Sequence, residues 1–506
     1  MAAWFGQNLR APVARPCRAA RVLVPLLPYS LALLCLSGCK PVGPDYSRPG
    51  YSAPATYKET GAAAIVPPAN PQGGAWQAAN PSDGLLKGKL WEVYQDPRLN
   101  ELEERIDASN VQLRQAVETD LAAQDQVRAA RANLYPTLAA GGGVSRDRVS
   151  ANRPLAARGG ATTYGDFAIS GQASWEPDFW GRVRRSIEEA HANAQASAAD
   201  TANVSLTLHA EMATDYFALR GLDAETELLT KTVGDLEKQA ELAEQRFNGG
   251  VATAADVAQA QTQLETVRAE LVDLGVARAK YEHAIGTLAN ANLTEFRMPP
   301  APLDLELPKI PVGVPSQLLE RRPDIAEAER LTAAANARIG IAVSAFYPNI
   351  TLGGGGGFES TNGGTWLQGP SSLWSLGAQA SQLLFDAGQR HALSDAARHS
   401  YEAQADGYRN TVFQAFNDVE DQLSSLRILE QEATAEQHAV DAAQHSLDLA
   451  NTRYKGGVTS YLEVLTAEQA LIQNQVNAIG IRSREFAASV SLIRALGGGW
   501  DVTQLR

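Results

Sequence analysis

This chain repeats one octapeptide: it reads Arg246-Phe247-Asn248-Gly249-Gly250-Val251-Ala252-Thr253 and, 207 residues later, Arg453-Tyr454-Lys455-Gly456-Gly457-Val458-Thr459-Ser460. Every position is identical or similar except the Asn248/Lys455 pair. Each copy lies between two long stretches of helical character, so each is predicted to be the tip of a helical hairpin. A Gly-Gly pair supplies the positive φ that ends one helix, and the Thr or Ser beyond it can cap the next. Two copies in matching context indicate an internal duplication.

A proline-free stretch precedes each tip, from about residue 181 to 246 and from about residue 388 to 453. As helices at 1.5 Å per residue, each would be roughly 100 Å long. Apolar residues recur in steps of four and three before the first tip, at Leu229, Val233, Leu236, Ala240, Ala243 and Phe247. This heptad spacing, with many small residues, predicts antiparallel coiled-coil hairpins that pack laterally against similar rods.

Four strand-like segments lie between the helical stretches. They cover about residues 137–150 and 162–176 in the first copy, and about 349–360 and 372–385 in the second. Strands of about ten residues suit a membrane β-barrel, whereas no segment after residue 39 is apolar enough for a transmembrane helix. Four strands cannot close such a barrel, so several chains are expected to contribute strands to one barrel.

The N-terminus has the features of an export signal. Four arginines precede an apolar run of about 15 residues that ends in Leu36-Ser37-Gly38-Cys39. This ending is similar to a bacterial lipobox, which implies a signal peptide over 1–38 and a lipid on Cys39; the alternative is a plain signal peptide with an incidental cysteine. Lys40, rather than aspartate, follows Cys39 and favours the outer membrane. Cys17 and Cys35 would be removed with the signal, so no disulfide is expected.

Residues 39–89 are rich in Pro, Gly, Ala and Ser and are predicted to form an extended tether. Order is expected from residue 90. Asp96 is a plausible cap and Pro97 a plausible first residue of one helix running to about Leu134.

Charge and composition exclude several function classes. The formal net charge is −13, and removal of residues 1–38 would leave −17, which argues against nucleic-acid binding. Seven histidines are scattered through helical stretches without a ligand motif, so no metal site is expected. No nucleophile turn or catalytic constellation is present, so we expect no enzyme and no cofactor.

Four motifs carry a family resemblance: Leu318–Glu329 (LLERRPDIAEAE), Trp91–Leu99, Trp175–Arg182 and Leu384–Gly388. With these motifs the chain resembles TolC-like outer-membrane efflux proteins of the lipidated OprM/NodT branch, over about residues 39–500. The resemblance implies an α+β membrane protein that forms a homotrimer, in which each chain gives four strands to a shared twelve-stranded barrel and hairpins to a long periplasmic helical barrel. The two repeats would cover 90–312 and 313–500, with a tail at 501–506.

The function implied by this resemblance is a passive exit duct for drugs or other small toxic molecules. An inner-membrane pump, usually of the resistance-nodulation-division type, would drive export, and a periplasmic adaptor would dock at the hairpin tips. The implied adaptor-contact residues are Arg246, Gly249, Gly250, Thr253, Arg453, Gly456, Gly457 and Ser460. The alternative for the two arginines is capping of helix carbonyls. For the whole chain, the alternative is a periplasmic coiled-coil lipoprotein with a structural or adaptor role.

A gate at the periplasmic end is also implied by the resemblance. The family has a ring of carboxylates beyond the second tip, and one of its positions matches Glu463, whereas a second falls on Thr466. The first repeat has Asp256 and Gln259 at the equivalent positions. Three copies of Glu463 and Asp256 could form a cation-selective constriction. The alternative is that each carboxylate simply favours the first turn of its helix.

Overall fold

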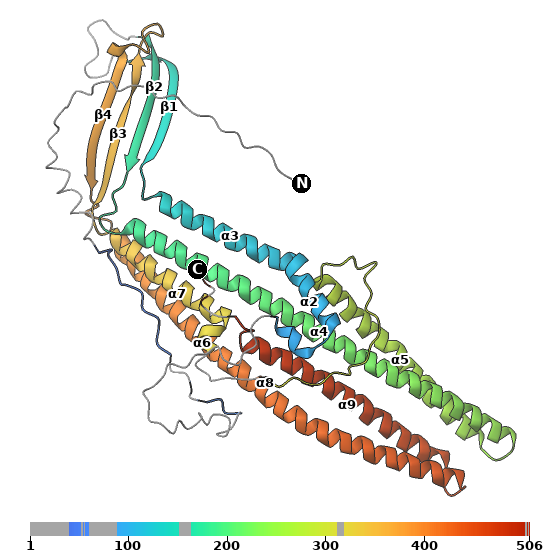
Figure 1. Cartoon of the computed structure of the whole chain (residues 1–506). Helices are drawn as coiled ribbons and strands as arrows, with labels where there is room; N and C mark the ends of the chain where they lie inside the picture. Colours follow the sequence, from blue (N-terminus) through green and yellow to red (C-terminus); the bar gives the residue numbers. More distant parts are fainter. Residues whose placement is uncertain are drawn as a thin grey trace, which may run out of the picture.

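A computed structural model describes residues 40–51, 54, 56–59, 89–150, 163–310, 318–500, 503 and 505. A β-sheet forms one end of the molecule, and a long bundle of helices runs away from it (Figure 1). The predicted signal peptide and Cys39 lie outside the described residues, as do most of the tether from residue 60 to 88 and the boundary between the two repeats.

Two helical hairpins of equal size dominate the bundle. Helices α4 (Arg182–Asn248) and α8 (Gln389–Lys455) have 67 residues each, and helices α5 (Ala254–Leu288) and α9 (Tyr461–Ala495) have 35 residues each. The long helices and their turns therefore lie where the sequence predicts them. None of the helices in the described part of the chain is both long enough and apolar enough to cross a bilayer.

The remaining helices lie between the sheet and the middle of this bundle (Figure 1). They are η1 (Leu90–Tyr94), α2 (Pro97–Ser109), α3 (Val111–Ala132), α6 (Leu318–Arg321) and α7 (Pro323–Ser344). Asp96 caps α2, as predicted, by accepting from the backbone N–H groups of Arg98 and Leu99.

The prediction of one helix from Pro97 to about Leu134 was wrong. The chain breaks at Asn110, whose ψ of 129° is extended. The Asn110 side chain accepts from the backbone N–H groups of Gln112 and Leu113 and donates to the carbonyl of Leu288 at 2.8 Å. Asparagine side chains compete in this way with the helical bonding pattern. A cap and a tertiary hydrogen bond together therefore separate α2 from α3.

The sheet has the order β1-β2-β3-β4, and all neighbouring strands are antiparallel. The strands are β1 (Thr137–Arg148), β2 (Thr163–Trp175), β3 (Asn349–Ser360) and β4 (Ser372–Ser381), and a short 3₁₀ turn, η3 (Gly369–Ser371), precedes β4. The fourth strand ends four residues earlier than predicted. The reason is that Ser381 pairs with Asn349, the first residue of β3, so the chain beyond Ser381 has no strand to bond to.

The two halves of the chain meet where β2 pairs with the glycine run of β3. A Cβ atom on Gly357 would lie 2.1 Å from the carbonyl oxygen of Ile169, so only glycine fits there. The glycine run thus permits close pairing between strands.

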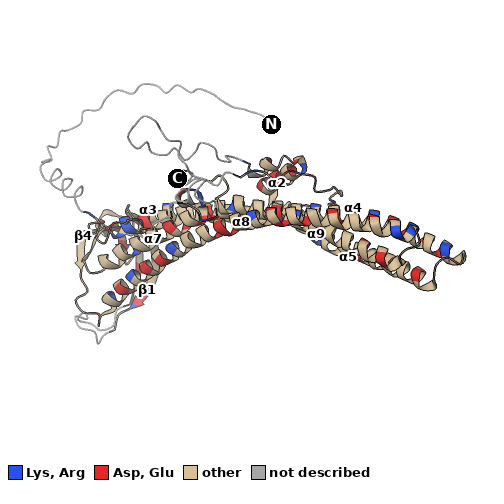
Figure 2. Ribbon diagram, turned by 90° about the horizontal axis from the view of Figure 1, so that it is seen from below, with Lys and Arg blue, Asp and Glu red and all other residues tan. Residues whose placement is uncertain are grey.

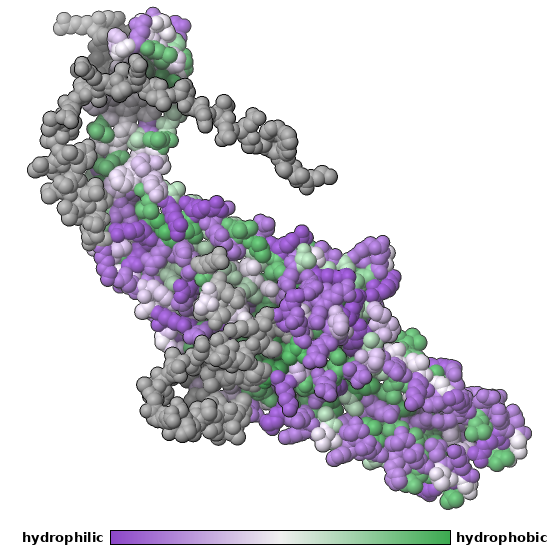
Figure 3. Space-filling view, in the orientation of Figure 1, coloured by the Kyte–Doolittle hydropathy of each residue, from purple (hydrophilic) through white to green (hydrophobic). Residues whose placement is uncertain are grey.

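The sheet has one polar face and one apolar face, because alternate residues of each strand point to opposite sides. Following the register, the polar face carries Thr137, Ser145, Ser170, Gln172, Thr351 and Gln379. The opposite face carries Leu138, Val144, Phe167, Ile169, Leu352, Trp374 and Leu376. Polar residues including Ser170, Gln172, Thr351 and Gln379 line a hollow in the sheet. Figure 3 shows apolar side chains between paler ones on the sheet surface.

The main hydrophobic core lies midway along the bundle, where η1 and α2 pack on α4 and α9. The rings of Phe217 and Phe486 stack at 4.6 Å there, and the ring of Tyr94 lies 4.7 Å from that of Phe217. Acidic and basic residues are mixed along the helices rather than gathered by sign (Figure 2).

The described part of the tether lies against the helical body. The Tyr46 hydroxyl donates to Glu329 at 2.6 Å, Arg48 donates to the hydroxyl of Tyr408 at 3.0 Å, and Glu59 pairs with Arg427 at 2.7 Å. These bonds fasten Tyr46, Arg48 and Glu59 to α7 and α8.

Candidate functional site at the hairpin tips

Both tips have the same turn geometry. Gly250 and Gly457 have φ angles of 74° and 70°, in the left-handed region that favours glycine. The residue after each glycine donates its backbone N–H back to the last turn of the helix, from Val251 to Arg246 at 2.8 Å and from Val458 to Arg453 at 3.0 Å. This pattern is a Schellman turn. The second glycine of each pair therefore has the predicted backbone role, whereas Gly249 and Gly456 keep helical φ angles.

The residues that begin the returning helices differ between the tips. Thr253 and Asp256 form a capping box: the Asp256 N–H donates to the Thr253 hydroxyl at 3.2 Å, and the Thr253 N–H donates to the Asp256 carboxylate at 2.8 Å. Ser460 occupies the corresponding position, but its side chain makes no capping bond. The capping box thus supports the alternative that the Asp256 carboxylate stabilises the first turn of its own helix.

The four residues of the predicted gate differ in their contacts and exposure within one chain. Glu463 lies 3.4 Å from the guanidinium of Arg453, and both side chains are about half exposed. Thr466 is exposed and donates its hydroxyl to the carbonyl of Leu462. Gln259 is half-buried. The structure therefore places Glu463 and Thr466 on one exposed side of α9, and assigns Asp256 to its cap.

The two hairpins of one chain are joined near their tips. The guanidinium of Arg246, at the end of α4, lies 4.6 Å from the ring centre of Tyr454, near the end of α8. The Tyr454 ring in turn lies 5.4 Å from that of Tyr461. Among the described residues neither Arg246 nor Arg453 donates from its side chain to a helix carbonyl; Arg246 contacts Tyr454 and Arg453 pairs with Glu463.

A second connection lies one to two turns farther along the hairpins. The Tyr461 hydroxyl donates to the side-chain oxygen Oε1 of Gln239 at 3.1 Å, and Nε2 of the same amide donates to the Glu468 carboxylate at 2.8 Å. Burial raises the pKa of the Glu468 carboxyl above its usual range. We call Arg246, Tyr454, Tyr461, Gln239 and Glu468 the inter-hairpin latch. Sequence reasoning missed Tyr461, Gln239 and Glu468; the only available signal was that polar residues occupy positions beside the apolar heptad stripe.

Apolar side chains are exposed at the outermost point of each tip. Val251 is 71% exposed and Val458 is 72% exposed, and Phe247 beside them is partly exposed. An isolated exposed valine is ordinary, but here an exposed valine recurs at the equivalent position of both hairpin tips. Each such tip is available for another protein.

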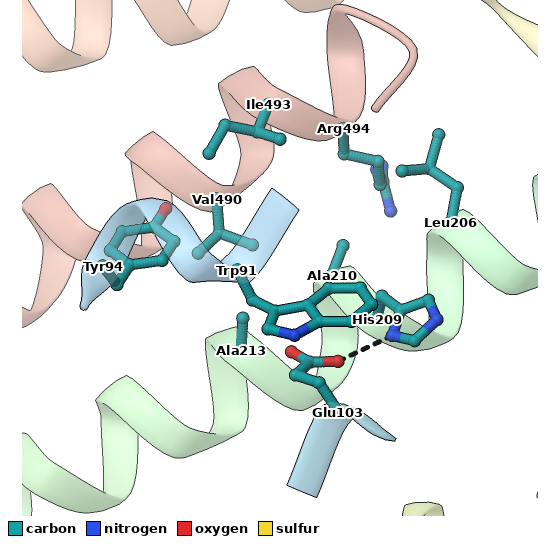
Figure 4. Close-up of a pocket in the computed structure, with 10 residues that line it drawn as sticks. All are labelled: Trp91, Tyr94, Glu103, Leu206, His209, Ala210, Ala213, Val490, Ile493 and Arg494. Carbon is teal, nitrogen blue, oxygen red and sulfur yellow. Dashed lines mark hydrogen bonds and ion pairs between the residues drawn. The ribbon is translucent and has the colours of Figure 1, made fainter. Parts of the chain in front are cut away.

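One further cluster of buried ionisable groups lies far from the tips, in the main core. The carboxylate of Glu103 on α2 lies 2.7 Å from Nδ1 of His209 on α4, and the ring of Trp91 stacks on the imidazole at 4.3 Å (Figure 4). Burial raises the pKa of Glu103 to about 7. The adjoining cavity, of about 30 Å³, has room for one or two water molecules. This cluster joins α2 to α4, and it gives His209 a structural role that the sequence did not indicate.

Comparison with known proteins agrees with this architecture. The family model described as "Outer membrane efflux protein" matches residues 102–291 and 314–498. Among curated relatives, the probable efflux pump outer membrane protein TtgC of Pseudomonas putida is 31% identical over 477 residues, covering 94% of this chain and 96% of the relative. The pyoverdine export outer membrane protein OpmQ of Pseudomonas aeruginosa is 30% identical and covers 84% of this chain and 90% of the relative.

Solved structures give the same result. The outer-membrane channel OprN superposes with a TM-score of 0.81 at 26% identity, covering 91% of this chain and 99% of that one. The open-state channel MtrE of Neisseria gonorrhoeae superposes with a TM-score of 0.77 at 28% identity, covering 91% and 98%. These proteins are channels of the outer membrane rather than enzymes. The chain belongs to the outer membrane efflux protein family, and it is an outer-membrane exit duct with a long periplasmic helical part.

Proposed function

We propose that three copies of this chain form one duct with a shared twelve-stranded barrel. The four-stranded sheet supports this proposal because β1 and β4 each have one edge without a partner in the described chain. With an even number of antiparallel strands, β4 of one copy can pair antiparallel with β1 of the next, and the ring has no exposed edge. The polar face then lines the pore and the apolar face meets lipid.

The same assembly accounts for the helices. Two equal hairpins per chain, which we attribute to an internal duplication, would give six hairpins around one periplasmic tube. Exposed apolar residues along their sides, such as Val272, Ile428 and Leu449, would be covered by neighbouring copies. The alternative of a periplasmic coiled-coil lipoprotein does not account for a sheet with one polar and one apolar face.

The duct is proposed to act with a periplasmic adaptor and an inner-membrane pump, and to conduct drugs or other small toxic molecules. The names of these relatives refer to an efflux pump and to pyoverdine export, which supports small organic molecules as the substrate class. The apolar tips at Val251 and Val458 are the proposed adaptor surface, together with the turn residues around them.

Site-specific photo-crosslinking in cells tests the adaptor proposal. A photoreactive residue at position 251 or 458 is expected to capture a periplasmic protein with a coiled-coil hairpin. Position 276 on α5 is the control, because Val276 is equally exposed at 71% but lies away from the tip. Capture at position 276 and not at the tips would contradict docking at the tips.

A lipid on Cys39 is proposed as the anchor. Residues 41 and 42 support it, because they lie at the junction between β2 and α4: the Val42 N–H donates to the Trp180 carbonyl at 2.9 Å, and Pro41 lies against Gly181. The tether thus begins at the end of the helical body from which the sheet extends. Mass spectrometry of the mature N-terminal peptide tests the proposal, and an unmodified Cys39 would contradict it.

Glu463 is proposed as the main carboxylate of a cation-selective constriction, with Asp256 contributing more weakly because it is engaged in its capping box. Three copies of Glu463 near the threefold axis would repel one another and attract cations. Thr466 and Gln259 at the adjacent positions are uncharged, so the ring would have fewer charges than the family pattern.

Single-channel conductance of the purified trimer in planar bilayers tests the duct and this constriction together. We expect cation-preferring openings whose selectivity falls in Glu463→Gln. Openings with unchanged selectivity in that variant would keep the duct and remove the gate assignment.

A further inference from the structure

Charged residues at the far end of the sheet are sorted by face. Asp147, Asp166 and Glu359 have the same parity as the polar residues and lie on the polar face. Arg146 and Arg148 alternate with Asp147 on β1, so they lie on the apolar face, in line with Leu138 and Val144. Acids and arginines at this level therefore point in opposite directions, which a uniformly solvated rim would not require.

Arg146 and Arg148 lie just beyond the end of the apolar part of their face. On β2 this face runs from Trp175 to Phe167, eight residues or about 26 Å along the strand. At the tilt of about 40° usual for a barrel, this is a height of about 20 Å, close to the apolar band of an outer-membrane barrel. Val144 pairs with Phe167, and Arg146 pairs with Gly165, one step beyond. Arg146 thus lies at the boundary of the band, and Arg148 lies about 7 Å farther along the strand.

Both guanidinium groups are exposed and form no ion pair or side-chain hydrogen bond among the described residues. Aromatic groups typical of a membrane interface lie at the same level of the sheet: Phe167 on β2 shares a face with Arg146 and pairs with Val144, and its ring lies 5.9 Å from that of Trp366 in the β3–β4 turn. Among the described residues no ion pair joins the nearby acids to the arginines; Asp147 lies on the polar face, where it accepts a hydrogen bond from Ser145.

We propose that Arg146 and Arg148 bind the phosphate groups of an anionic glycolipid in the outer leaflet, of the lipid A type. Arginine presents a planar fork of N–H donors that matches phosphate oxygens. The two arginines lie on one side of one strand, at the height where the headgroups of the lipids around the barrel begin. Each chain contributes one such site, and the site would hold the barrel at a fixed depth in the membrane. The inference rests on the proposed insertion of the sheet as a barrel.

The test is binding of diphosphorylated lipid A and its dephosphorylated form to the purified protein in detergent, measured by native mass spectrometry. The unaltered protein is expected to bind the diphosphorylated form about tenfold or more tightly. This preference should disappear in the double variant Arg146→Gln/Arg148→Gln and should largely remain in Arg146→Lys/Arg148→Lys. The matched control is Arg128→Gln/Arg131→Gln, which removes two exposed arginines of α3 and should keep the preference.

Two results would overturn the proposal: equal binding of both lipid forms by the unaltered protein, or full phosphate preference in Arg146→Gln/Arg148→Gln. If the double variant does not fold, Arg146→Gln and Arg148→Gln are tested singly, and full phosphate preference in both would likewise overturn the proposal. Single-channel conductance distinguishes a failure of the lipid site from a failure of the proposed barrel. A conducting trimer without phosphate preference contradicts only the lipid site, whereas a protein that never conducts contradicts the barrel itself.

Discussion

Removing one hydroxyl group from the inter-hairpin latch should open the duct. Tyr461 is 4% exposed, and its hydroxyl donates to Gln239, which itself bonds to Glu468. Tyr461→Phe keeps the ring against Tyr454 and removes only this donor. A hydrogen bond of this kind contributes about 1 kcal/mol, and the Gln239 oxygen is left without its partner.

The effect should be amplified by the proposed threefold assembly. If the three chains open together, the loss of about 1 kcal/mol in each chain shifts the equilibrium by about 3 kcal/mol, or about 100-fold. Arg246→Gln removes the contact with Tyr454, worth about 0.5–1 kcal/mol at an exposed site, and should give a smaller shift in the same direction.

The assay is the open probability of single trimers in planar bilayers. We expect an increase of about two orders of magnitude for Tyr461→Phe over a mostly closed wild type. Tyr281→Phe is the control, because Tyr281 packs beside the main core and its hydroxyl has no hydrogen-bond partner among the described residues. An intact Tyr461→Phe trimer with wild-type open probability would refute the role of the latch in keeping the duct closed.

Three further predictions follow from other parts of the chain. Burial raises the pKa of the Glu103 carboxyl to about 7, so the folded state favours the protonated acid. The stability that this protonation contributes is full below about pH 4.5 and is lost as the pH rises through 7. Glu103→Gln should therefore remove about 2 kcal/mol of pH dependence from the stability measured by thermal unfolding between pH 5 and 8. Gly357→Ala places a methyl group 2.1 Å from the Ile169 carbonyl and should greatly reduce the yield of membrane-inserted protein on extraction, whereas an unchanged yield would contradict the close pairing of β2 and β3. Reversal potentials in a salt gradient should show a larger loss of cation preference for Glu463→Gln than for Asp256→Asn, and the reverse order would contradict the assignment of Asp256 to its cap.

The features that the sequence predicted depend on local chemistry. A glycine at positive φ, a capping Thr and period-two alternation each act within a few residues, so the tips and strands could be located from the sequence. The lengths of α4 and α8 followed from the absence of proline between tip and strand.

The features that the sequence did not predict depend on tertiary contacts. Periodicity shows which face of a helix is buried but not which helix covers it, so the pairing of Gln239 with Tyr461 and that of Glu103 with His209 were not accessible. Asn110 ends α2 partly through a bond to Leu288, about 180 residues away, and β4 ends at Ser381 because its partner strand ends there.

The central claim, that three chains close one barrel through β1 and β4, is tested most directly by cysteine crosslinking across that junction. Val144→Cys on β1 is combined in turn with cysteines at the apolar-face positions of β4, namely Trp374, Leu376, Ala378 and Ala380. Cross-strand neighbours are close enough for a disulfide. We predict that at least one combination gives covalent dimers and trimers and nothing larger on a denaturing gel. A ladder extending beyond the trimer, or no crosslink at any position in membrane-inserted protein, would contradict the shared barrel.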